Sequence, residues 1–188
     1  AYNDRAGLVD IFGGQEDLEK HVVRCVGEPE ERFTEDALRI LRAVRFSAQL
    51  GFSIEEGTRK AARTLAHTLE HISAERIQAE LVKLLISPYP QYLGTAWELG
   101  LTKIFLPEFD REMETPQNNP HHQKNVGEHT LKALEAVEPD KVLRLAALFH
   151  DMGKPDCRVT DEEGTDHFRG HQKISQEIAQ RVLRRLRF

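Results

Sequence analysis

Four charged side chains within an apolar segment are the first candidates for chemistry. They step by three along the chain: Asp36, Arg39, Arg42 and Arg45. Residues three apart are neighbours on a helix surface, so the segment predicts a helix that is apolar almost all round with one charged stripe. Such a helix should lie inside the protein with its charges half buried. These charges must then be paired or hold a ligand, because desolvating an isolated charge is costly.

Asp36 and Arg39 offer complementary hydrogen-bonding groups. A carboxylate only accepts hydrogen bonds and a guanidinium only donates them, so side by side they present an acceptor next to a donor. That arrangement complements a base edge with an amino group beside a bare ring nitrogen, which cytosine and adenine have and guanine and uracil lack. The alternative is a plain ion pair three residues apart, which stabilises a helix by about a few tenths of a kcal/mol.

Histidines gather in the last third of the chain and indicate a second site. His150 and Asp151 follow the apolar residues 145–149, while His129 and His171 belong to separate helical patterns. Imidazoles and a carboxylate from different helices suit Mn²⁺, Ni²⁺, Co²⁺ or Zn²⁺ better than Ca²⁺. A metal held there would acidify a bound water. Three further histidines are more typical of loops: His121, His122 and His167.

The segments that must position these residues have helical patterns. Thr34 is predicted to cap the striped helix and Gly51 to end it. Ser53 is predicted to begin a second helix and Ser73 a third. Periodicity disappears over residues 110–119, where prolines and asparagines predict a connection. The sequence therefore predicts an all-α fold.

Composition narrows the class of protein. The chain has 188 residues, of which 39% are hydrophobic and 30% charged, and no apolar run is long enough to cross a membrane. A formal net charge of −5 argues against nucleic-acid binding by bulk electrostatics alone. Two cysteines without metal-ligand spacing predict a reducing, cytoplasmic setting. The sequence carries no signal for an oligomeric state.

Four stretches in order carry a family pattern. They are DIFGGQEDL (10–18), TEDALRILRAVRFSAQLGF (34–52), ISAERIQAELVKLL (72–85), and HDMGKP (150–155) with GHQKIS (170–175). Together they resemble the bacterial and eukaryotic tRNA nucleotidyltransferases and poly(A) polymerases that carry an HD domain. The resemblance covers essentially the whole chain.

The resemblance implies roles for individual residues. In that family the Asp and Arg of an EDxxR motif act as the template for the incoming base, which implies this role for Asp36 and Arg39. It also implies nucleotide binding by Arg42 and Arg45. The ERI segment packs beside the base-reading helix in the family, so Arg76 is expected to help position that helix.

The resemblance also implies a domain organisation. Residues 1–29 would be a remnant of a catalytic head and its connection, 30–109 a helical neck and body, 110–120 a linker, and 121–188 a partial HD domain. The family's head holds Mg²⁺ through paired aspartates, and no such pair or GGxxRD-like motif occurs in this sequence. We therefore expect this chain to be part of a longer enzyme and to be inactive alone in nucleotidyl transfer.

The function implied is transfer of CMP or AMP from CTP or ATP to the 3′ end of tRNA. Addition of CCA, of A alone or of poly(A) are all compatible with the motifs. The HD site would be metal-dependent, with His129, His150, Asp151 and His171 as ligands, and would lack an aspartate that usually follows. One alternative is a metal-dependent HD phosphohydrolase acting on 2′,3′-cyclic phosphates or nucleotides, with the neck as scaffold. Another is a non-catalytic RNA-binding remnant.

Overall fold

The computed structural model describes residues 2–4, 7–118 and 125–188, and these are mostly helical. The predicted all-α fold is confirmed. The helices are α1 (Gly14–Glu19), α2 (Pro29–Glu35), α3 (Leu38–Leu50), α4 (Glu56–Thr64), η1 (Ala66–His71), α5 (Ala74–Leu85), η2 (Pro90–Tyr92), α6 (Leu93–Glu98), α7 (Thr102–Phe105), α8 (Pro107–Glu114), α9 (Val126–Ala136), α10 (Lys141–Phe149), α11 (Lys154–Cys157) and α12 (His171–Arg185). The strands are β1 (Tyr2–Asn3), β2 (Gly7–Leu8), β3 (Val22–Val23), β4 (Ser53–Ile54), β5 (Val159–Thr160) and β6 (Asp166–His167).

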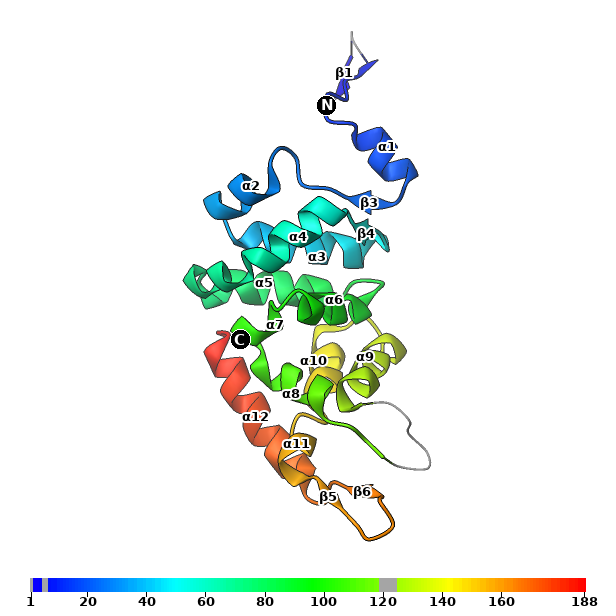
Figure 1. The fold of residues 1–188 in the computed structure, drawn as a ribbon, viewed down its shortest axis with the longest axis vertical. Coiled ribbons are helices and arrows are strands. Elements are labelled where there is room, and N and C mark those ends of the chain that lie inside the picture. The colour runs from blue at the N-terminus through cyan, green and yellow to red at the C-terminus, as the bar shows by residue number, and fades with distance from the viewer. Residues whose placement is uncertain (1, 5–6, 119–124) are drawn as a thin grey trace.

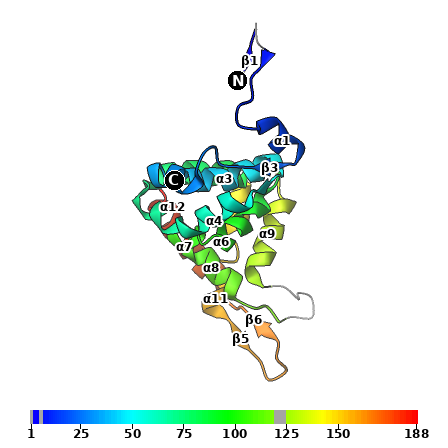
Figure 2. The same ribbon diagram turned by 45° about the horizontal axis from the view of Figure 1, so that its top comes forward.

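The molecule is elongated, with an N-terminal arm that projects from the helical body (Figure 1). The arm consists of β1, β2 and α1, and the view of Figure 2 shows the same projection. β3 joins the arm to the body by pairing in parallel with β4, with Val22 opposite Ser53 and Val23 opposite Ile54. The other two strand pairs, β1 with β2 and β5 with β6, are antiparallel.

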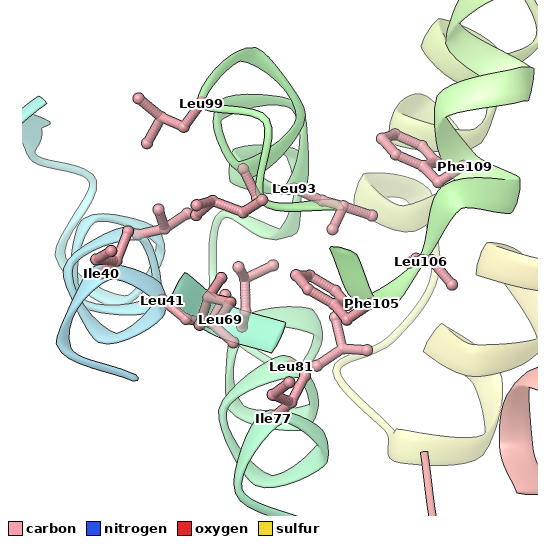
Figure 3. Packing of buried hydrophobic residues seen from close by; sticks show 14 of the residues in the cluster. Ile40, Leu41, Leu69, Ile77, Leu81, Leu93, Leu99, Phe105, Leu106 and Phe109 are labelled. Atoms are coloured by element: carbon pink, nitrogen blue, oxygen red, sulfur yellow. The ribbon is translucent and has the colours of Figure 1, made fainter. Parts of the chain in front are cut away.

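Helix α3 is the central helix of the body, as its apolar circumference predicts. Its residues Ile40, Leu41 and Val44 are fully buried, and α3 packs chiefly against α5. Figure 3 shows Ile40 and Leu41 pointing from α3 into the cluster that contains Leu81 of α5. Each such aliphatic side chain contributes roughly 1.5–3 kcal/mol by leaving water. This burial fixes α3, and with it the charged stripe, in place.

The hydrophobic core continues from α3 into the C-terminal helices without a break. Leu134 of α9, Leu148 of α10 and Val182 of α12 belong to the same cluster of buried residues as the α3 side chains. α12 is also held by its last turn, where both guanidinium Nη atoms of Arg185 donate to Glu108 of α8. The C-terminal helices are therefore packed on the body.

Two predicted helix starts are wrong, for related reasons. Thr34 lies inside α2, where its hydroxyl donates to the carbonyl of Glu30 at 2.7 Å, so it caps nothing. Ser53 belongs to β4, and the cap of α4 is Glu55, whose carboxylate accepts from the amides two and three residues on. In both places a second residue competes for the capping role, and tertiary pairing decides between them. The predicted end of α3 at Gly51, with φ 70°, is confirmed.

The predicted connection begins later than the sequence indicates. Residues 110–114 are helical and complete α8, so the non-helical segment starts at Thr115. Phe109 and Glu112 are buried in this helix, and burial sustains it where the sequence pattern is weak. Ser73, by contrast, stands at the predicted N-cap of α5 but makes no side-chain capping hydrogen bond. The predicted domain boundaries themselves stay a prediction.

Two further properties bear on the class of protein. Among the described residues, no helix is both long and apolar enough to cross a membrane. Cys25 and Cys157 are partly buried and are not joined in a disulfide. A cytoplasmic location stays a prediction from cysteine usage.

Candidate functional site

Asp36 lies in the break between α2 and α3 rather than on a continuous helix. Its backbone is extended, with φ −152° and ψ 101°. One carboxylate oxygen accepts from the amide of Leu38 at 3.2 Å, so Asp36 caps the start of α3 that Thr34 was predicted to cap. The other accepts from Nη2 of Arg76 on α5 at 2.8 Å. Partial burial opposes ionisation, but these hydrogen bonds outweigh it and hold the pKa of Asp36 below its usual range.

Arg39 is the second residue of α3 and is held by α2. Its Nη1 donates to the carboxylate of Glu35 at 2.6 Å and to the carbonyl of Arg32 at 2.9 Å. Within the described residues Asp36 and Arg39 form no direct ion pair, which removes the plain-pair alternative. Each is instead fixed by its own partner, and both remain partly exposed.

The remaining two arginines of the stripe have different environments. Arg45 is buried, with Nε 2.9 Å from a carboxylate oxygen of Glu80 on α5 and Nη1 2.6 Å from Gln49. Arg42 is exposed, with its guanidinium carbon 5.9 Å from the centre of the Phe46 ring. The three arginines of the stripe therefore differ in burial: Arg39 is half buried, Arg42 is exposed and Arg45 is buried. Arg45 forms an ion pair between α3 and α5.

A cavity of about 230 Å³ brings part of the stripe together with apolar side chains. Arg39, Arg42 and Phe46 of α3 line one side of it, and Arg24, just after β3, lines another. Arg24 is held by Asp17 of the arm, with Nε 3.1 Å from both carboxylate oxygens. Sequence patterns indicate no role for Arg24, because its segment predicts only an extended stretch.

Helix α5 positions both ends of the stripe. Arg76 holds Asp36, as expected from the sequence, and Glu80, one turn later on α5, holds Arg45. Glu80 was missed, since nothing in the sequence connects it with a residue 35 positions earlier. The two contacts fix the rotation of α3 relative to α5.

The second site lies where α9, α10 and α12 meet, in the lower half of Figure 1. His150 follows the last residue of α10 and Asp151 comes next, while His129 is on α9 and His171 begins α12. Donor atoms of His129, His150 and Asp151 all lie within 4.8 Å of one another. His171 approaches the other oxygen of the same carboxylate, with Nε2 3.4 Å from Asp151 Oδ1.

Backbone carbonyls orient two of these imidazoles. Nδ1 of His150 lies 2.7 Å from the carbonyl oxygen of Ala147, and Nδ1 of His171 lies 2.7 Å from that of Phe168. A carbonyl only accepts, so Nδ1 carries the proton and Nε2 is left to face Asp151. This is the arrangement by which proteins prepare histidines as metal ligands.

Asp151 is the centre of the cluster. Its Oδ2 lies 3.0 Å from Nε2 of His150, 3.5 Å from Nε2 of His129 and 2.8 Å from Nζ of Lys154, yet accepts no well-aligned hydrogen bond from the described residues. Burial opposes ionisation, but the contacts of the carboxylate with His150 and Lys154 outweigh it and lower the pKa of Asp151 to about 2. Asp151 raises the pKa of His150 in return, against the effect of burial. A buried, ionised and poorly satisfied carboxylate among imidazoles fits a divalent transition metal.

Gly153 allows the cluster to close. Its amide donates to the hydroxyl of Ser175 at 2.9 Å, and an added Cβ would collide with the backbone of His171 and Ser175 on α12. Its role is the close approach that places His171 beside Asp151.

Among the described residues, His167 is not part of this cluster. His167 lies on β6 with Nε2 2.7 Å from a carboxylate oxygen of Asp161. It therefore lies on a short strand rather than in the loop predicted for it. His121 and His122 lie outside the described residues.

Comparisons with known proteins divide the chain into two matched parts. A family model described as the probable RNA- and SrmB-binding site of polymerase A matches residues 51–113. A model of the HD domain matches residues 121–188.

Relatives match most of the chain but less of their own length. The A-adding tRNA nucleotidyltransferase of Deinococcus radiodurans is 36% identical over 192 residues, covering 96% of this chain and 44% of that protein. The CCA-adding enzyme of Bacillus cytotoxicus is 49% identical over 106 residues, covering 56% of this chain and 26% of that protein. The chain thus spans less than half the length of these relatives.

Solved structures of similar proteins share the fold. The CCA-adding enzyme of Bacillus stearothermophilus in complex with CTP gives a TM-score of 0.60 at 29% identity, covering 96% of this chain and 41% of that one. The Thermotoga maritima CCA-adding enzyme complexed with tRNA gives 0.58 at 23% identity, covering 97% and 40%. At the lower identity the likeness concerns the fold alone.

Proposed function

We propose, since the chain belongs to the family of tRNA nucleotidyltransferases and poly(A) polymerases that carry an HD domain, that it selects the base of the incoming nucleotide in such an enzyme. The reaction would transfer CMP or AMP from CTP or ATP to the 3′ end of tRNA. The partners are proposed from similar proteins, which include a CCA-adding enzyme solved with CTP and another solved with tRNA. The phosphoryl-transfer centre and its Mg²⁺ ions would belong to the part of the enzyme outside this chain.

The observation that carries the proposal is the separate anchoring of Asp36 and Arg39. Two of the roughly four acceptor sites of the Asp36 carboxylate are used, by Leu38 and Arg76. Both hydrogen bonds of Arg39 use Nη1, so its remaining N–H groups are available. A fixed acceptor and a fixed donor, both partly exposed, can then pair with the amino group and ring nitrogen of cytosine or adenine.

Substitution of Asp36 by Ala in the longer enzyme tests this proposal. The change removes the acceptor for the amino group, so discrimination against GTP and UTP should fall by about ten-fold or more, as expected for contacts of roughly 1–3 kcal/mol. Incorporation from each of the four triphosphates into tRNA measures it. Glu31→Ala, an exposed acidic residue on α2, is the matched control. If Asp36→Ala still excludes GTP and UTP as strictly as the parent, base selection lies elsewhere.

A second candidate function, metal-dependent phosphohydrolysis, is favoured by the cluster around Asp151. His129, His150, Asp151 and His171 would hold an ion such as Mn²⁺, Ni²⁺, Co²⁺ or Zn²⁺, which when bound would acidify a water. The backbone carbonyls behind His150 and His171 keep Nε2 free for that ion. The substrates proposed are 2′,3′-cyclic phosphates and phosphate esters of nucleotides.

Removal of the central carboxylate tests the second candidate. Asp151→Asn should weaken metal binding by about 100-fold or more, since losses of even supporting groups cost about 10–100-fold. Metal content after chelation and reloading, and hydrolysis of cyclic phosphates, are the two measurements. Asp156→Asn on α11 is the control, because Asp156 pairs with Arg111 away from the cluster. Equal metal uptake by Asp151→Asn and the parent would leave the cluster a structural role only.

A further inference from the structure

Another cavity lies on the body between α4, η1, α6 and α7, and neither candidate function uses it. Its volume is about 500 Å³, within the range of about 300–1,000 Å³ that is typical of small-ligand sites. Arg63 in the last turn of α4, His67 of η1 and Lys103 of α7 line it with basic groups. Trp97 of α6 adds an aromatic ring that is partly buried against the hydrophobic core. The cavity therefore combines cationic side chains with one large aromatic surface.

The cations of this cavity have no ion-pair partners among the described residues. Arg63 and Lys103 are both exposed, and Lys103 acts on the carboxyl of Asp110 only at a distance. Glu98, the acidic side chain that lines the cavity, is already paired with Arg59 of α4. The chain has a formal net charge of −5, so an uncompensated positive patch differs from its average surface. Such a patch attracts an anion.

A nucleotide carries both kinds of group that this cavity is built to bind. Its phosphate is an anion for guanidinium and ammonium groups, and its base is a flat ring that stacks on an aromatic side chain. Sites for single-stranded nucleic acid have this composition. Stacking on Trp97 requires an unpaired base, because the bases of a duplex are stacked on one another. An acidic peptide would pair with the cations, but its carboxylates offer Trp97 no flat ring.

We propose that this cavity binds an unpaired nucleotide of RNA, with the base stacked on Trp97 and the phosphate held by Arg63 and Lys103. The inference takes its RNA partner from the proposed function, but it does not depend on base selection by Asp36 and Arg39. None of the residues that line this cavity lines the one beside Arg39. The RNA would therefore have a contact surface of its own, formed by α4, η1, α6 and α7.

Trp97 is the sole tryptophan of the 188-residue chain, so its fluorescence reports on this cavity. An unpaired RNA oligonucleotide of about eight nucleotides, added without CTP or ATP, should quench this fluorescence. The same RNA in a duplex should quench it far less. Fluorescence anisotropy of a labelled RNA compares the variants. Trp97→Leu should bind RNA about five-fold or more weakly than the parent, and Trp97→Phe, which keeps a ring, should bind more tightly than Trp97→Leu.

The phosphate contacts are tested by the salt dependence of the affinity. Arg63→Gln and Lys103→Gln should each reduce the slope of log affinity against log salt by about 0.7, because each removes one phosphate contact from a single strand. Lys60→Gln is the matched control and should keep the slope of the parent. Lys60 is an exposed cation of α4 that does not line the cavity.

The outcomes separate this inference from base selection, which is measured by nucleotide incorporation instead. The inference is overturned if unpaired RNA does not quench Trp97, or if the duplex quenches it equally. Equal losses in Lys60→Gln and Arg63→Gln would also overturn it, since the attraction would then come from overall charge. Quenching by an acidic peptide but not by RNA would assign the cavity to a protein partner. Thermal unfolding checks the Trp97 variants, and the Arg63 and Lys103 variants, which keep Trp97, decide the question should Trp97→Leu be unfolded.

Discussion

The proposed base-reading surface (Asp36, Arg39 and Arg45) and the proposed metal centre (His129, His150, Asp151 and His171) are positioned by different kinds of contact. Asp36 and Arg45 are held by side chains 40 and 35 residues away on α5. His150 and His171 are each held by a backbone carbonyl three residues earlier. A residue anchored to its own turn is placed by local sequence, whereas one anchored to another helix depends on the packing of the whole body.

This difference determines which parts of the fold must be formed for each region to keep its geometry. In the proposed metal centre, the imidazoles of His150 and His171 keep their orientation as long as α10 and the start of α12 are formed. The base-reading surface needs the correct rotation of α3 against α5, which is set by the core and by two ion pairs.

The largest effect is expected at the buried ion pair of the base-reading surface. Glu80→Gln leaves the Arg45 guanidinium, which is 9% exposed, without its charged partner. Removing one member of a buried pair destabilises a protein by about 3–5 kcal/mol. The free energy of unfolding in urea measures this.

The control for Glu80 lies one turn away. Lys83→Gln removes a half-exposed partner of the same carboxylate and should cost less than about 1 kcal/mol. A cost for Glu80→Gln as small as for Lys83→Gln would show that the α5 anchor is dispensable. The two regions would then differ less than the geometry indicates.

The difference between anchoring by the residue's own turn and anchoring by another helix also explains what could be predicted from the sequence. The apolar circumference of α3 and its end at Gly51 follow from local pattern, and the structure has both as predicted. His150 and Asp151 follow α10, as the pattern indicates, and their role as metal ligands stays a prediction. Glu80 and Arg24 were missed because each acquires its role from a partner on another element. Capping was mispredicted at Thr34 because Asp36, two residues later, satisfies an amide of the next helix. Competition between neighbouring capping residues is settled by tertiary contacts that sequence does not display.

The smallest effect expected is a pair of opposite pH dependences in the metal-free protein. The pKa of His150 is raised on folding, so its contribution to stability is complete below about pH 6.5, the unfolded value, and is lost as pH rises through the folded pKa. The pKa of Asp36 is lowered on folding, so its contribution is present above about pH 3.9 and is lost as pH falls through the folded pKa. Both side chains are partly exposed, which limits each effect to about 1 kcal/mol or less.

Unfolding free energies from pH 3 to about pH 9, with a chelator present, test these signs. The difference between the parent and His150→Gln should shrink toward alkaline pH. The difference between the parent and Asp36→Asn should shrink toward acid pH. Asp151, with a pKa of about 2, stays ionised over this range and does not reverse either sign. The prediction is wrong if both differences shrink toward the same end of the pH range. It requires a pKa raised on folding at His150 and a pKa lowered on folding at Asp36.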